Sequence, residues 1–236
     1  MRNFYILNFI YAFSVFPLTA QLMSVESSAL AANDIQFESS ELKTALSQDI
    51  DGLMSKVVKW RHHLHEYPEL GNREFKTSKY IADILNNLGL EVNTGIAYTG
   101  ITAYIRGEHS GPLIALRADI DALPVTELTN LPYASKETTM YQGNKVGVMH
   151  ACGHDAHVAV LLGVADFLSR NTDKLHGDIR LIFQPAEEGP PEGEGGGAEL
   201  MRKEGSFKEK PEVVFGMNET NEYEVEIAGK AGAARA

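Results

Sequence analysis

The sequence predicts an α/β fold in which a sheet carries helices on both faces. Short apolar segments typical of strands alternate with segments whose apolar residues follow helical spacing. In addition, three groups of polar residues each come directly after a predicted strand, where open α/β sheets build their sites. The chain has 236 residues, 44% of them hydrophobic and 22% charged, which is enough for one large domain or two small ones.

The N-terminus has the composition of an export signal. Arg2 precedes an uncharged stretch, Asn3–Val25, which Pro17 interrupts before small residues that suit a cleavage site. A retained membrane anchor is the alternative, because the stretch approaches the length that spans a bilayer. We expect a signal peptide over residues 1–32 and a polar linker over 33–40, and therefore an exported protein that is periplasmic or secreted.

Two helices are expected before the first strand. Apolar residues follow helical spacing over Glu41–Glu66, and Pro68 ends that helix. The same spacing recurs over Thr77–Leu88, with Gly89 suited to the C-cap position.

The rest of the chain is expected to alternate between strands and helices. Strands are predicted at Glu91–Asn93, Ile101–Arg106 and Pro112–Arg117, with a hairpin-like turn at Gly107–Gly111 between the last two. Further on come a strand at Lys145–Met149, an apolar helix at Asp155–Ser169, a strand at Asp178–Phe183, a helix at Gly197–Glu204 and a strand at Val213–Met217.

Residues 150–157 (HACGHDAH) are the densest group of metal-binding residue types in the chain. They contain three histidines, an aspartate and the only cysteine, Cys152. Thiolate, imidazole and carboxylate groups are the ligands that zinc and similar divalent metals accept. A buried cysteine beside helix-capping residues is the simpler interpretation, but it does not explain so dense a group. Cys152 cannot form a disulfide within the chain, and metal coordination would protect its thiol in an exported protein.

Two further polar groups follow predicted strands, at residues 117–124 (RADIDALP) and 184–189 (QPAEEG). Turn-forming aspartates and a solvated acidic pair would explain each group separately, but neighbouring strand ends converge in space. Two metal ions roughly 3.5–4 Å apart can activate a water, and a carboxylate outside the metal's ligand set must then take the water's proton. Glu187 and Glu188 offer that division of roles, although spacing alone does not settle which residue does which.

Four segments, in order, resemble the signatures of the M20 metallopeptidase family. They are Trp60–Gly71 (WRHHLHEYPELG), Leu116–Pro124 (LRADIDALP), Met149–His157 (MHACGHDAH) and Phe183–Gly189 (FQPAEEG). The resemblance is to the amidohydrolase branch, which includes hippurate hydrolases, N-acyl-amino-acid amidohydrolases and auxin-conjugate hydrolases. It implies that residues 41–236 are the N-terminal part of a three-layer, zinc-peptidase-like catalytic domain.

The resemblance also implies roles for individual residues. Cys152, His154 and Glu188 would be metal ligands, and Glu187 would be the general base. Asp119, Asp121 and His157 would support these groups from outside the metal's ligand set. Arg61, His65 and Glu69 would fix the N-terminal helix and the loop after it. The cofactor would be a divalent metal (Zn, Mn, Ni or Co), with up to two ions in the full-length family.

By the same resemblance, the chain is expected to be a metal-dependent amidohydrolase that cleaves the amide bond of N-acyl amino acids or similar small conjugates. Two features depart from the family pattern. Asn218 stands where the family has a ligand histidine, and the chain stops about where the family inserts an α+β lid and dimerisation domain. The chain is therefore expected to be C-terminally truncated. The alternative to an enzyme is an inactive fragment that retains partial metal binding or an interaction role.

The expected partner is a small N-acyl amino acid or a peptide-like substrate. The formal net charge of −11 disfavours nucleic acid and anionic membranes. We expect no stable membrane partner after signal cleavage, and by the family resemblance we also expect the dimerisation domain to be missing.

Overall fold

The computed structural model describes residues 28–217, which belong to two units, Met1–Met54 and Ser55–Ala236. Helix α2 (Ser28–Glu66) begins in the first unit and ends in the second. It starts earlier than Glu41 and takes in residues 33–40, where we expected a linker; Ala29, Ala31 and Ala32 favour a helix there. Most of the expected signal peptide lies outside the described residues, so export remains a prediction. Within residues 28–217, no helix has both the length and the apolar character that a bilayer crossing requires.

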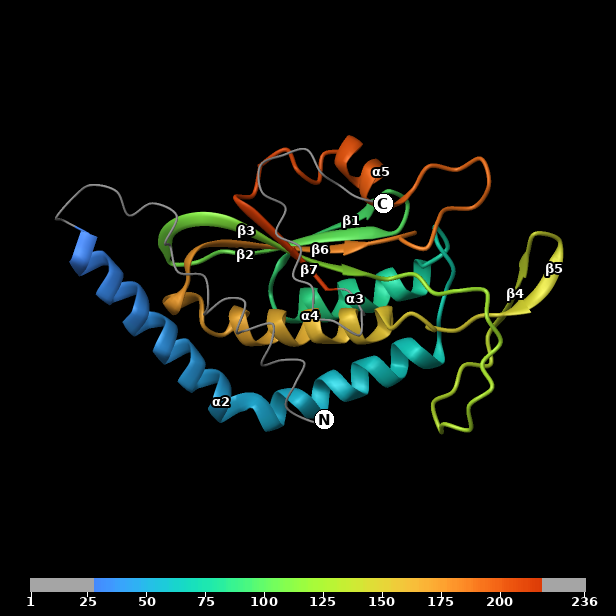
Figure 1. The fold of residues 1–236 in the computed structure, drawn as a ribbon, viewed down its shortest axis with the longest axis horizontal. Coiled ribbons are helices and arrows are strands. Elements are labelled where there is room, and N and C mark those ends of the chain that lie inside the picture. The colour runs from blue at the N-terminus through green and yellow to red at the C-terminus, as the bar shows by residue number, and fades with distance from the viewer. Residues whose placement is uncertain (1–27, 218–236) are drawn as a thin grey trace. The chain divides into compact units, whose positions relative to one another are not determined.

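The second unit is built on a five-stranded sheet of order β1-β2-β6-β3-β7 (Figure 1). Its strands are β1 (Glu91–Ile96), β2 (Gly100–Ile105), β3 (His109–Asp119), β6 (His176–Gln184) and β7 (Val213–Gly216). The β1–β2 and β2–β6 pairs are antiparallel, whereas β3 runs parallel to both β6 and β7. The predicted α/β class is confirmed, with a mixed central sheet.

Helices cover this sheet on both faces (Figure 1). α3 (Phe75–Asn87) and α4 (His154–Ser169) lie on one face, and the short α5 (Gly197–Lys203) lies on the other. A short 3₁₀ turn, η2 (Thr172–Lys174), precedes β6. α4 is buried almost all round, because the C-terminal part of α2 also packs on it; Lys56 Nζ, for example, lies 2.6 Å from Asp166 Oδ2.

The hairpin expected between the second and third strands is wrong, because β6 lies between β2 and β3. The glycines of that turn serve a different purpose. A Cβ on Gly107 would lie 2.2 Å from the carbonyl oxygen of Gly177, and one on Gly111 would lie 2.5 Å from that of His176. These glycines allow close approach to the start of β6.

The strand expected at Lys145–Met149 exists, but it does not belong to the main sheet. It is β5 (Asn144–Gly147), which pairs only with the unpredicted β4 (Thr138–Tyr141) in a separate two-stranded sheet. The segment that contains Cys152 is held at Met149 instead. The backbone N–H of Met149 donates to the carbonyl oxygen of Leu123, and the N–H of Leu123 donates to that of Met149, both at 3.0 Å.

The two other polar groups meet as predicted. The parallel register of β3 and β6 puts Asp119 opposite Gln184 at the carboxyl ends of the strands. Arg117 Nε donates a 2.7 Å hydrogen bond to Gln184 Oε1 across the same pair. Residues 117–124 and 184–189 therefore begin side by side at one edge of the sheet.

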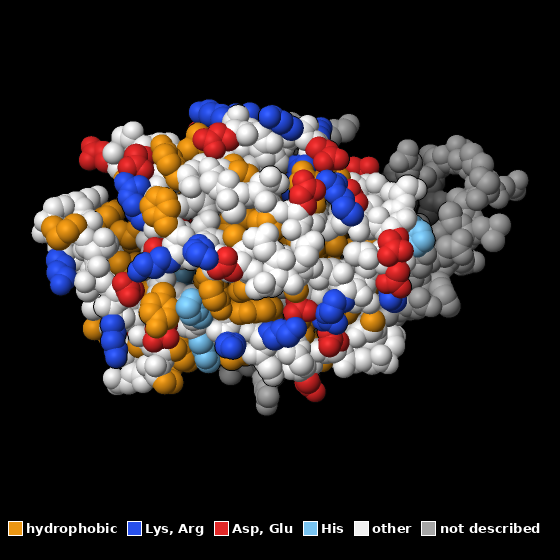
Figure 2. Space-filling model, turned by 180° about the vertical axis from the view of Figure 1, so that it is seen from behind, with side chains coloured by type: hydrophobic (Ala, Val, Ile, Leu, Met, Phe, Trp, Pro, Cys, Tyr) orange, Lys and Arg blue, Asp and Glu red, His pale blue; other side chains and the backbone are white. Residues whose placement is uncertain are grey.

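Charged side chains are mixed on the surface. On the face shown in Figure 2, the described acidic and basic side chains are interspersed with hydrophobic ones and form no large patch of one sign.

Candidate metal centre

Cys152, His154 and Glu188 come together at the edge of the sheet. Each offers one ligand atom, and these atoms all lie within 4.8 Å of one another. His154 is the first residue of α4, and the N-cap residue Gly153 has a φ of 97°, a left-handed conformation that suits glycine. This turn lets residues two apart in the sequence face the same point. The structure thus gathers the three residues that the sequence analysis expected to be ligands.

His154 has one ring nitrogen fixed and the other directed at the acidic pair. Its Nδ1 lies 2.9 Å from the carbonyl oxygen of Asp121, which can only accept, so Nδ1 carries the hydrogen. Its Nε2 lies 3.6 Å from Glu187 Oε2 and 3.9 Å from Glu188 Oε1. Histidines that bind metals usually have their second nitrogen held in this way.

The electrostatic setting of His154 suits a cation. Burial lowers the pKa of His154, but the hydrogen bond to Asp121 and the charges of Asp119 and Asp121 outweigh this effect and raise the pKa to about 9. Without a metal, Nε2 of His154 therefore also carries a proton at neutral pH, and the ring is positively charged. A bound divalent ion would take the place of that proton.

Asp121 positions two of the three candidate ligand residues. Its backbone carbonyl orients His154, and its Oδ2 accepts a 2.9 Å hydrogen bond from the backbone N–H of Glu188. It is nearly inaccessible to solvent. The structure gives Asp121 the supporting place that the resemblance implied.

Glu74 holds the turn that carries Glu187. Ala186 adopts a left-handed φ of 48°, and its N–H donates a 2.9 Å hydrogen bond to Glu74 Oε1. The other carboxylate oxygen of Glu74 accepts a 2.6 Å bond from Thr99 Oγ1. Gly71 lies against the same turn, where a Cβ would lie 2.7 Å from the carbonyl oxygen of Gly189. No feature of the local sequence indicated these roles of Glu74 and Gly71.

Glu187 is placed to act on a group bound at His154. Its side chain is 40% exposed, against 24% for Glu188, and it approaches the same nitrogen of His154. One carboxylate can therefore join the ligand set while the other stays open to solvent and substrate.

A second group of side chains shares His154. Ligand atoms of Asp119, His154 and His157 lie within 4.8 Å of one another, and all three residues are buried. Burial raises the pKa of Asp119 to about 7, although Arg117, with a nitrogen 2.5 Å away, opposes the shift. Burial lowers the pKa of His157 to about 4. One imidazole nitrogen binds one ion, so His154 cannot serve both groups at once.

These residues fit a divalent ion. Ligand atoms that share one ion at about 2.0–2.3 Å lie roughly 3–4 Å apart, so the three expected ligands need only a small closing movement. Among the described residues, Nδ1 of His157, whose side chain belongs to the second group, is buried without a hydrogen-bond partner. Both nitrogens of His150, four residues before His154, are buried in the same way. A set of thiolate, imidazole and carboxylate donors is typical of zinc-like metals.

The position where the family pattern has a ligand histidine lies outside the described residues. Asn218 stands at that position, directly after the last described residue, 217.

Glu69 has the fixing role that we expected. Its Oε2 accepts hydrogen bonds of 2.8 and 3.0 Å from N and Oγ1 of Thr77, near the start of α3.

Comparison with known proteins agrees with this fold and site. Residues 115–230 match the sequence model of the family described as Peptidase family M20/M25/M40. The N-acetyl-L-cysteine deacetylase of Bacillus subtilis (strain 168) is 42% identical over 200 residues, which cover 77% of this chain and 45% of that protein. The hippurate hydrolase of Campylobacter jejuni is 38% identical over 207 residues, which cover 79% of this chain and 50% of that protein.

A solved structure supports the same relationship. The crystal structure of a Bacillus subtilis protein described as a dinuclear metal binding peptidase from the M20 family superposes with a TM-score of 0.63 at 39% identity. The match covers 72% of this chain and 44% of that one. The chain is an α/β protein with a candidate metal centre, and it belongs to the M20/M25/M40 peptidase family. It spans about half the length of the curated relatives that it matches.

Proposed function

We propose that this chain supplies the metal-binding half of an amidohydrolase active site that cleaves the amide bond of N-acyl amino acids. The observation that carries the proposal is the meeting of Cys152, His154 and Glu188 within 4.8 Å, with Glu187 beside them. The N-acetyl-L-cysteine deacetylase and the hippurate hydrolase among the relatives support the substrate class.

In this proposal, Cys152, His154 and Glu188 would hold a divalent ion, which when bound would make a water more acidic and polarise the amide carbonyl. Glu187 would accept a proton from the attacking water and pass it to the leaving amine. Asp121 keeps His154 and Glu188 in place, and Glu74 keeps the Ala186 turn in the conformation that presents Glu187.

Metal removal tests the proposal. The full chain, loaded with Zn²⁺, Mn²⁺ or Co²⁺ in turn, is incubated with N-acetyl and N-benzoyl amino acids, and the released α-amine is quantified. We expect hydrolysis with at least one metal, loss after chelation, and recovery when the same metal is added back. Turnover that survives complete removal of metal would contradict the proposal. Stoichiometric metal binding without turnover would favour the inactive fragment.

A further inference from the structure

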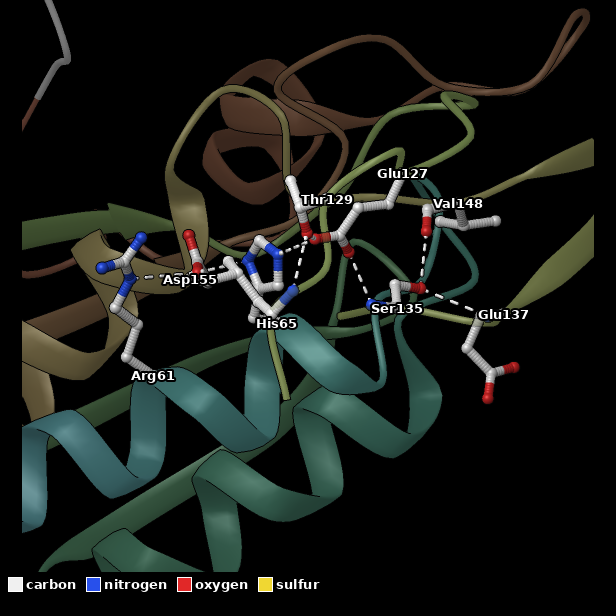
Figure 3. Close-up of polar contacts among 9 residues, drawn as sticks. Arg61, His65, Glu127, Thr129, Ser135, Glu137, Val148 and Asp155 are labelled. Carbon is white, nitrogen blue, oxygen red and sulfur yellow. Dashed lines mark hydrogen bonds and ion pairs between the residues drawn. The ribbon is translucent and has the colours of Figure 1, made fainter. Parts of the chain in front are cut away.

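His65, at the end of α2, lies between two buried carboxylates from distant parts of the chain (Figure 3). Its Nδ1 is 2.9 Å from Asp155 Oδ2, and its Nε2 is 3.3 Å from Glu127 Oε1. The three side chains are 6%, 1% and 0% exposed. Arg61, one turn earlier on the same helix, adds a second donor to Asp155 Oδ2 at 3.2 Å.

Asp155 is joined to the metal centre by the backbone. Asp155 follows His154 directly in the first turn of α4. When Asp155 is held by α2, the position of that turn is fixed relative to the helix. His154 and, two residues earlier, Cys152 are then held with it.

The Glu127 end is attached to the other side of the same segment. Glu127 accepts a hydrogen bond from Thr129 Oγ1, and its Oε2 lies 2.5 Å from the backbone N of Ser135. Ser135 Oγ in turn donates a 2.7 Å bond to the carbonyl oxygen of Val148 (Figure 3). The segment from Val148 to Asp155, which carries Cys152 and His154, is therefore fixed at both ends by one chain of polar contacts.

The pKa shifts of His65 and Glu127 agree with these hydrogen bonds. The hydrogen bond to Asp155 raises the pKa of His65, despite the opposing effect of burial, and Glu127 adds to the rise. Burial raises the pKa of Glu127, but hydrogen bonds from Thr129, Ser135 and His65 outweigh it and lower the pKa overall. The ring is therefore suited to donate from both nitrogens at once.

We propose that His65 is a positioning residue for the metal centre. Through its bonds to Asp155 and Glu127, His65 holds the Val148–Asp155 segment in the geometry that binds the ion. The inference rests on the proposed function, since it assigns Cys152 and His154 to the metal. It differs from a plain tether between α2 and α4, which would change the stability of the chain and leave metal binding as it is.

Two substitutions separate the two bonds of His65. The amide nitrogen of asparagine lies close to the place of Nδ1, whereas that of glutamine reaches the place of Nε2. His65→Asn thus keeps a donor for Asp155 and loses the one for Glu127, and His65→Gln does the reverse. Each purified full-length variant is titrated with Co²⁺, and the dissociation constant is measured with the thiolate-to-cobalt and ligand-field absorption bands. Thermal unfolding without metal is recorded alongside.

We expect His65→Gln to bind Co²⁺ about 10-fold more weakly, with a weaker thiolate-to-cobalt band at saturation, because supporting residues of metal sites typically contribute 10–100-fold in affinity. His65→Asn should stay within about 3-fold of the wild type, since the bond nearest to the ligands survives. Unchanged affinity and spectrum in His65→Gln would overturn the inference, whatever the change in unfolding temperature.

Should His65→Gln fail to fold, the isosteric Asp155→Asn, which weakens the bond to Nδ1 of His65, is measured in the same way. Weaker Co²⁺ binding is expected, and an unchanged spectrum and affinity would overturn the inference. If the wild-type chain itself binds no Co²⁺, the proposed metal site fails, and this inference fails with it. If the wild type binds and the His65→Gln variant matches it, only the inference about His65 fails.

Discussion

Glu187→Gln is expected to lower the turnover of an N-acyl amino acid by about 10²–10⁴-fold, the usual contribution of a general base. Glutamine keeps the shape of the side chain beside Nε2 of His154 but cannot accept a proton from water. The ion should remain bound, because Glu187 is not one of the three expected ligands. Turnover is measured at saturating substrate, and metal content is measured by elemental analysis of the same sample.

Glu192→Gln provides the matched control, because Glu192 is an exposed acid on the following loop. It should leave both turnover and metal content at wild-type values. Loss of the metal from Glu187→Gln would show that Glu187 is a ligand, so that the roles of Glu187 and Glu188 are exchanged. Unchanged turnover with the metal in place would remove Glu187 from the mechanism.

Glu74→Gln is expected to change the pH dependence of folding stability. Burial raises the pKa of the Glu74 carboxyl from 4.5 to about 7, and the hydrogen bonds from Thr99 and Ala186 only partly offset that effect. Between these two pH values the folded chain holds a proton that the unfolded chain has lost. This contribution to stability is complete below about pH 4.5 and is lost as the pH rises through 7, at a total cost of about 3 kcal/mol.

Glutamine cannot ionise, so the Glu74→Gln variant should not show this loss. Urea unfolding of the metal-free chain, followed between pH 4.5 and 8, should show the variant gaining about 3 kcal/mol relative to the wild type across that range. Glu192→Gln again controls for the loss of one carboxylate. A difference between Glu74→Gln and the wild type that stays flat with pH would contradict the account of Glu74.

That the three candidate ligands come together could be predicted from the sequence, because their signals are local. Cys152 and His154 lie two residues apart, and Glu188 follows a strand whose end was identifiable from its apolar run. The parallel register of β3 and β6 then makes the strand ends meet, as open α/β sheets generally do. The sequence alone was also sufficient for the class of fold, since the alternation of strands and helices is visible in the spacing of apolar residues.

The contacts of Glu74 and His65 could not be predicted, because their partners are far away in the chain. Glu74 bonds to a turn 112 residues later, and His65 joins residues 62 and 90 positions away. Neither pairing leaves a pattern in the local sequence. The order of the strands was missed for a similar reason. Gly107 and Gly111 looked like turn residues, but the structure uses them for close contact with the distant start of β6.

X-ray absorption at the zinc edge, on the full chain loaded with one equivalent of Zn²⁺, tests directly whether Cys152 binds the ion together with His154 and Glu188. We expect one sulfur at about 2.3 Å and nitrogen and oxygen ligands at about 2.0–2.2 Å. The sulfur should disappear in Cys152→Ala, while the lighter ligands remain. A wild-type spectrum that contains only nitrogen and oxygen ligands would mean that the metal lies elsewhere.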